Sequence, residues 1–124
     1  MLTKSKFLAG DVCPKRLWLS ENRPELAAPA SEAEKRRAEQ GRTVTELARE
    51  YFPSGVLISA VDSSAAIAET KEAIANGATV LFEAAFSTSD VLARADIIEK
   101  TPAGWHLIEV KSSGSVKKGH LPDV

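Results

Sequence analysis

Two acidic residues and a lysine are spaced in this sequence so that they can share one small site on a β-hairpin. Glu109 and Lys111 lie two residues apart at the end of an expected strand, and alternation along a strand turns both to the same face. The segment 101–104 contains proline and glycine and predicts a turn. Counting back through that turn places Asp96 directly opposite Glu109, with Cβ atoms ~4.5–5.5 Å apart.

Two carboxylates at this distance need positive charge close to them. Like charges that oppose each other directly on a sheet are destabilising, so the pair requires a compensating cation. Lys111 would supply part of the compensation, and a divalent metal with oxygen ligands would supply the rest. The spacing therefore indicates a metal site that includes Asp96 and Glu109.

Length and composition indicate one ordinary domain. The chain has 124 residues, of which 44% are hydrophobic, and this is enough for a packed core. No apolar run approaches the ~20 residues of a membrane span, and the first residues do not form a secretory signal. A single cysteine cannot form an internal disulfide, so we expect a reducing, cytoplasmic setting.

Charge is distributed unevenly along the chain. Residues 1–42 contain nine Lys or Arg and six Asp or Glu, whereas residues 43–99 contain three basic and nine acidic residues. Residues 100–124 are basic again, with four lysines and two acids. The two basic flanks could contact phosphate groups, although the charge pattern alone favours a solvated surface of mixed charge.

Alternating helical and strand patterns predict an α/β fold with a mixed, largely antiparallel sheet flanked by helices. The hairpin register pairs Lys100 with Trp105. Helices are expected as two short pieces within 3–22, from Ser31 to about Tyr51 or Phe52, and from Ser63 or Ser64 to Asn76 and Gly77. Strands are expected at 56–61, 79–86, 91–99 and 105–111.

Both strands of the hairpin are apolar on both faces, so both faces of the sheet should be covered. Strict alternation assigns Ala95 and Ile97 to one face and Asp96 to the other. We expect Trp18 and Trp105 to be core residues rather than platforms for stacked bases.

An Asp on one strand and Glu-x-Lys on its neighbour resemble the core signature of the PD-(D/E)XK nuclease superfamily. The chain is most similar to the RecB-like branch, which includes CRISPR-associated exonucleases with an iron–sulfur cluster. Segments 81–86, 94–98 and 108–113 follow the strand order of that branch. Within it, the sequence most resembles an uncharacterised bacterial family, the domain of unknown function 2779, over nearly its whole length.

The resemblance implies a restriction-endonuclease-like core in a single RecB-like domain, 1–124, and a Mg²⁺ or Mn²⁺ centre. Its metal ligands would be two strand carboxylates, one helical carboxylate and a backbone carbonyl: Asp96, Glu109, Glu46 and Val110. Lys111 would orient or help deprotonate the attacking water, so the catalytic set is Asp96, Glu109 and Lys111.

The sequence departs from the branch in three places. Thr45 stands where the branch has a helical histidine, one residue before Glu46. Cys13, in Cys-Pro-Lys-Arg-Leu-Trp, resembles the first iron–sulfur ligand, but the other three cysteines are absent. The helical Gln that follows the lysine strand would lie beyond Val124. We therefore expect the chain to be the N-terminal part of a longer protein, the only form in which a cluster is expected.

The implied activity is metal-dependent hydrolysis of phosphodiester bonds in nucleic acid, with DNA preferred to RNA as the expected substrate. Arg94, Lys117 and Lys118 are candidate contacts to the nucleic acid, although Arg94 could pair with a carboxylate and the lysines could be ordinary loop charges. The alternative is an inactive module for nucleic-acid binding or assembly that retains the acidic patch. A third reading is a shortened chain that folds only by oligomerising. The sequence leaves the oligomeric state open.

Overall fold

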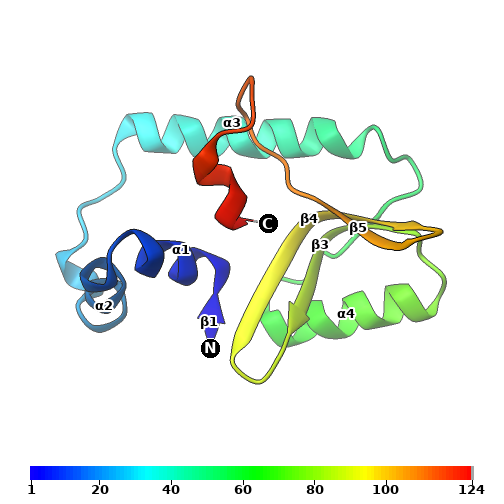
Figure 1. Ribbon diagram of the computed structural model, residues 1–124, viewed down its shortest axis with the longest axis horizontal. Helices are drawn as coiled ribbons and strands as arrows, with labels where there is room; N and C mark the ends of the chain where they lie inside the picture. The colour runs from blue at the N-terminus through cyan, green and yellow to red at the C-terminus, as the bar shows by residue number, and fades with distance from the viewer. Residues whose placement is uncertain (124) are drawn as a thin grey trace.

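A five-stranded mixed sheet lies between helices in the computed structural model, which describes residues 1–123 (Figure 1). The strands are β1 (Leu2–Thr3), β2 (Val56–Leu57), β3 (Val80–Ser87), β4 (Val91–Thr101) and β5 (Gly104–Ile108). The helices are α1 (Lys4–Val12), α2 (Pro14–Asn22), α3 (Glu32–Arg49) and α4 (Ser63–Ala75), with 3₁₀ helices η1 (Pro24–Leu26) and η2 (Lys118–Asp123). This confirms the α/β class. None of the helices within 1–123 has the length and apolar character required to cross a membrane.

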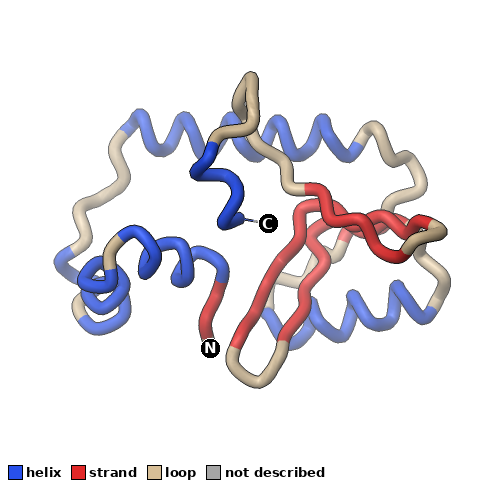
Figure 2. The backbone as a smooth tube through the Cα atoms, in the orientation of Figure 1, coloured by secondary structure: helices blue, strands red, loops and turns tan. Residues whose placement is uncertain are grey.

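The long central strand β4 organises the sheet. It pairs antiparallel with β3 along most of its length and with β5 at its C-terminal end, while β1 pairs parallel with its first residues. The short strand β2 adds to β3 in parallel, which gives the order β1-β4-β3-β2 with β5 beside β4 (Figure 2). The sheet is therefore mixed, as predicted.

The hairpin of β4 and β5 has the predicted register. Lys100 pairs with Trp105, and the positive φ of 131° at Gly104 allows the chain to turn directly after residues 102–103. The predicted second strand was too long, however. Strand β5 ends at Ile108, and residues 109–111 follow it outside the ladder.

The core has two parts, one on each face of the sheet. The cluster on the α4 side contains Ile58, Ala66, Leu81, Ala84, Ala85, Ala95 and Ile98. The cluster on the other side contains Val80, Phe82 and Ile97. Ala48, near the end of α3, and Phe52, in the segment after α3, pack against this cluster. Both faces of β3 and β4 are therefore covered as predicted, whereas β5, the second hairpin strand, is largely exposed and Leu107 on it is 39% exposed.

Alternation of side chains is interrupted halfway along β3 and β4, which the sequence pattern did not predict. Glu83 has a φ of 58°, in the left-handed region that residues other than glycine seldom adopt. Ala84 and Ala85 after it both pack in the α4-side cluster, and Ala95 joins them, whereas Ile97 packs on the α3 side. The expectation that Ala95 and Ile97 share a face was therefore wrong, because this left-handed residue shifts the alternation.

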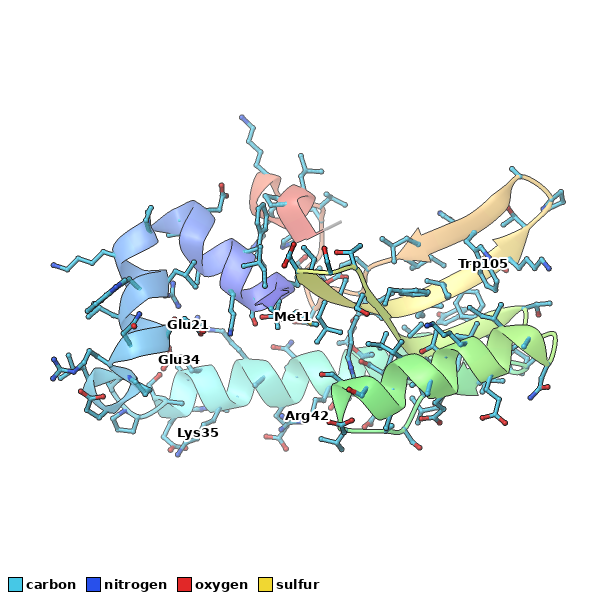
Figure 3. All side chains as sticks on the ribbon, turned by 90° about the horizontal axis from the view of Figure 1, so that it is seen from below. Met1, Glu21, Glu34, Lys35, Arg42 and Trp105 are labelled. Carbon is cyan, nitrogen blue, oxygen red and sulfur yellow. The ribbon has the colours of Figure 1, made fainter. Side chains whose placement is uncertain are left out.

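The two tryptophans are exposed rather than buried. Trp18 on α2 is 58% exposed and Trp105 on β5 is 43% exposed. Figure 3 labels Trp105 on the β4–β5 hairpin. Their assignment to the core was wrong, because β5 forms an outer strand and α2 packs mainly against α1 rather than on the sheet.

Replacing Thr70 by valine is expected to destabilise the fold by about 1–3 kcal/mol. The buried Thr70 hydroxyl donates to Ala66 O at 2.8 Å and accepts from Ala85 N at 3.0 Å, so valine leaves a buried N–H without its acceptor. Urea unfolding of Thr70→Val should show the loss, and Thr70→Ser, which keeps the hydroxyl, should be closer to wild type. Equal stability of Thr70→Val and wild type would contradict this assignment.

Acid is expected to weaken the attachment of α4 to the segment after β2. Glu69 accepts hydrogen bonds from Ala60 N and Ser59 N, and these bonds hold its pKa below the ordinary value. Because the folded pKa is lowered, the stabilisation is present above the unfolded pKa and is lost as the pH falls through the folded one. The melting temperature of Glu69→Gln should therefore fall less than that of wild type between neutral and acidic pH, and parallel decreases would refute the assignment.

Candidate active site

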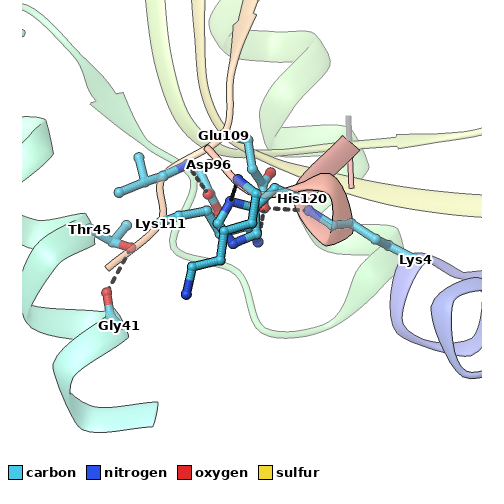
Figure 4. Close-up of polar contacts among 9 residues, drawn as sticks. Lys4, Gly41, Thr45, Asp96, Glu109, Lys111 and His120 are labelled. Atoms are coloured by element: carbon cyan, nitrogen blue, oxygen red, sulfur yellow. Dashed lines mark hydrogen bonds and ion pairs between the residues drawn. The ribbon is translucent and has the colours of Figure 1, made fainter. Parts of the chain in front are cut away.

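The buried carboxylate of Glu109 binds two lysines from distant parts of the chain. Its Oε1 atom lies 2.6 Å from Lys4 Nζ and 2.8 Å from Lys111 Nζ (Figure 4). The Glu109 side chain is only 9% exposed, whereas the lysines are 29% and 33% exposed. The predicted proximity of Glu109 and Lys111 is therefore found.

Asp96 lies beside this cluster because its side chain continues the strand pairing where β5 ends. Ile97 pairs with Ile108, and the register continued by one residue brings Asp96 opposite Glu109. Asp96 Oδ2 then accepts a hydrogen bond from Val110 N at 2.7 Å. The side chain thus takes the acceptor role that a backbone carbonyl has in a regular ladder, and it is held next to the segment 109–111.

The surroundings of Asp96 disfavour its negative charge. Burial raises the pKa of Asp96 above its ordinary value, and the carboxylate of Glu109 acts in the same direction. The hydrogen bond from Val110 N and the charges of Lys4 and Lys111 oppose this shift without cancelling it. Asp96 therefore binds a proton more readily here than an exposed aspartate does.

A pocket of about 320 Å³ opens beside Glu109 and Lys111. The loop after the site and η2 form its other side, where Ser113, His120 and Leu121 line it. His120 Nδ1 accepts a hydrogen bond from Lys117 N at 3.2 Å, which orients the ring. The predicted contact residues Lys117 and Lys118 are exposed at this end of the molecule.

Glu46 lies at a different hollow. It is exposed on α3 and lines a pocket of about 400 Å³ with Arg42, Arg49 and Glu83, in which Arg49 Nη2 lies 2.8 Å from Glu83 Oε1. Within residues 1–123, no group of three or more His, Cys, Asp or Glu side chains has the geometry of a metal site. The ligand role of Glu46 therefore stays a prediction.

Two further candidates, Arg94 and Cys13, line other pockets than the one beside Glu109. Arg94 Nη2 donates to Ala60 O at 2.5 Å and lines a pocket next to α1. Cys13 has a free thiol in the residue that caps α2, and it lines a separate pocket of about 510 Å³ with Arg16 and Arg23. Neither observation tests the predicted roles, which are a nucleic-acid contact for Arg94 and an iron–sulfur ligand for Cys13.

Sequence reasoning missed Lys4 and His120. Lys4 lies 105 residues from Glu109 in the chain, and no local pattern links them. His120 follows two lysines in the sequence, and no local pattern links it to the acidic pair. The only signal for Lys4 was indirect, since two opposed carboxylates require more positive charge than Lys111 alone supplies.

The donor atoms of the site fit Mg²⁺ or Mn²⁺. Within residues 1–123, the hydrogen bonds of the two carboxylates use Asp96 Oδ2 and Glu109 Oε1, so Asp96 Oδ1 and Glu109 Oε2 remain for another ligand. Mg²⁺ typically binds through one or two carboxylates and completes its shell with waters and substrate phosphates. Two carboxylates that each keep one oxygen outside these hydrogen bonds suit such an ion, and the backbone carbonyl of Val110 stays the further ligand that the sequence predicts.

Comparisons with known proteins identify no relative. No family model matches the sequence, and neither a curated protein nor a solved structure is similar to it at a significant level. The function therefore has to be argued from the residues and contacts of the chain itself.

Proposed function

We propose that this chain is a nuclease domain that hydrolyses phosphodiester bonds of nucleic acid with the help of Mg²⁺ or Mn²⁺. The convergence of Asp96, Glu109 and Lys111 on one partly buried patch is the observation that carries the proposal. Two carboxylates for a hard cation and a lysine beside them are the groups that metal-assisted phosphodiester hydrolysis requires. The resemblance to RecB-like nucleases, which rests on the same three residues, supports the same activity.

In this proposal each residue has a distinct task. Asp96 and Glu109 would hold the ion, and the hydrogen bond from Val110 N, at 2.7 Å, anchors the Asp96 carboxylate through its Oδ2 atom. The chemistry that the ion supplies is polarisation of a phosphoryl oxygen and a lowered pKa of bound water. Lys111, 2.8 Å from Glu109, orients the attacking water and stabilises the negative charge that develops on the phosphate.

The proposed substrate is DNA in a reducing, cytoplasmic compartment. A lone cysteine with a free thiol suits that compartment. The exposed lysines Lys117 and Lys118 follow the loop that lines the pocket beside Glu109, where they can contact the phosphates of a bound strand. Arg94 is the third proposed contact.

Cleavage of single-stranded DNA tests the proposal. The protein is incubated with a labelled oligonucleotide in Mn²⁺ and, in parallel, in EDTA. Shortened products in Mn²⁺ alone are expected, and the same comparison with an RNA of equal sequence decides between the two nucleic acids. Absence of products in Mn²⁺, Mg²⁺ and EDTA would contradict the proposed activity.

The second candidate is an inactive module that binds nucleic acid and retains the acidic patch. The contact of Lys4 with Glu109 favours it, because a lysine already compensates the carboxylate that a metal would need. Thr45 in the position of the branch's histidine favours it as well. A protein that binds oligonucleotide tightly but neither binds Mn²⁺ nor cleaves would establish this second function instead.

A further inference from the structure

A second hollow, next to the candidate active site, combines positive charge with hydroxyl groups. It has a volume of about 420 Å³. Its polar lining residues are Lys4, Arg94, Thr3, Ser5 and Ser63, and Leu8 and Leu92 complete the wall. These residues come from β1, α1, α4 and β4, which are far apart in the sequence. No Asp or Glu lines it among the described residues.

The chemistry of this lining suits a phosphate group. Arginine offers a fork of N–H donors that matches phosphate oxygens, lysine adds a compact charge, and hydroxyl groups donate further hydrogen bonds. The first turns of α1 and α4 also meet here, because Ser5 lies in the first turn of α1 and Ser63 is the first residue of α4. The backbone N–H groups at the start of α1 add to a field that favours an anion, whereas at α4 the carboxylate of the capping residue Asp62 offsets that field.

Two carboxylates close to the pocket accept hydrogen bonds from backbone N–H groups, and the charge of one of them, Glu69, also attracts Arg94. Asp62 caps α4 by accepting a hydrogen bond from Ala65 N, and Glu69 accepts from Ser59 N and Ala60 N. Arg94 is anchored by its contact with Ala60 O, so its side chain is ordered before a ligand binds. An ordered guanidinium loses less entropy on binding than a mobile one.

Lys4 connects this pocket to the candidate active site. It lines the pocket, and its Nζ atom lies 2.6 Å from Glu109 Oε1. The distance between a phosphate in the pocket and the acidic pair would therefore be about the length of one lysine side chain. Two consecutive phosphates of one nucleic-acid strand can then occupy the pocket and the position beside the acidic pair.

We propose that the pocket formed by Lys4, Arg94, Ser5 and Ser63 binds a backbone phosphate of the nucleic-acid strand next to the phosphate that is cleaved. The inference rests on the proposed nuclease function and gives it a substrate-positioning subsite. Glu109 and Lys111 then act on one phosphodiester while the pocket holds its neighbour.

Binding of labelled oligothymidylate in EDTA tests the subsite without the metal or cleavage. Arg94→Gln should weaken binding about tenfold and reduce the log–log salt slope by about 0.7, as for one lost contact to a single strand. The matched control is Lys100→Gln, which removes one charge at the other end of β4 and should bind like wild type.

A second variant separates binding from folding. Ser63→Asp places a negative charge at the start of α4, where it favours the helix but repels a phosphate. We expect its melting temperature to be at least that of wild type and its affinity to fall about tenfold or more. Inorganic phosphate should compete with the oligonucleotide in wild type and compete more weakly in Ser63→Asp.

Equal affinities of Arg94→Gln, Ser63→Asp and Lys100→Gln would overturn the subsite, as would a failure of wild type to bind the oligonucleotide. Phosphate competition that is unchanged in Ser63→Asp would overturn it too. Because EDTA removes the metal, normal binding together with absent Mn²⁺-dependent cleavage would reject the nuclease proposal while leaving the phosphate pocket standing.

Discussion

Replacing Asp96 by asparagine is expected to reduce Mn²⁺-dependent cleavage roughly a thousandfold, because a bound metal supplies several kcal/mol to such a reaction. Asparagine keeps an oxygen that accepts the hydrogen bond from Val110 N, so the local structure should persist. What it removes is the negative charge that would hold the ion. Isothermal titration should show Mn²⁺ affinity reduced by about tenfold or more.

The stability of Asp96→Asn provides the internal control. Since the pKa of Asp96 is raised in the folded state, the folded protein holds its proton more tightly than the unfolded chain does. Folding stability therefore falls as the pH rises from the unfolded pKa through the folded one, and asparagine removes this loss. Asp96→Asn should melt no lower than wild type at neutral pH. The matched variant Asp90→Asn, in the exposed turn before β4, should keep both metal binding and cleavage.

Replacing Lys111 by methionine is expected to separate catalysis from metal binding. Methionine keeps the apolar stem of the side chain but removes the ammonium group that lies 2.8 Å from Glu109. Cleavage should fall by about 10²–10⁴-fold, the range for loss of a group that moves or orients a proton. Mn²⁺ affinity should hold or increase, because one cation that competes for Glu109 is gone.

Lys118→Met is the matched control for this variant. Lys118 lies at the start of η2 and is exposed, so its loss should weaken nucleic-acid binding modestly without a large effect on the cleavage step. Single-turnover cleavage at saturating oligonucleotide distinguishes the two effects. Equal single-turnover rates for wild type and Lys111→Met would show that Lys111 has no catalytic task.

Local patterns predicted the hairpin and the central part of the candidate site. The pairing of Lys100 with Trp105 follows from the turn at 101–104, and it brings Asp96 next to Glu109. These relations depend on residues close in sequence and on counting the register from the turn, because the period of two fails between Ala95 and Ile97. They could therefore be derived without knowledge of the remaining chain.

Features that depend on distant packing could not be predicted in this way. The contact of Lys4 with Glu109 joins the first helix to the last strand segment, and only the complete fold brings them together. Glu83 shifts the alternation of the strands through a left-handed φ that its residue type does not signal. The strand after the turn also ends at Ile108, because the Asp96 side chain replaces the next ladder acceptor.

A crystal structure of the protein soaked in Mn²⁺, with anomalous diffraction recorded, tests the central claim most directly. The account predicts one strong anomalous peak within bonding distance of Asp96 Oδ1 and Glu109 Oε2, with Lys4 displaced from its position at 2.6 Å. A fully soaked crystal with no peak between these carboxylates, and with Lys4 still bound to Glu109, would contradict it.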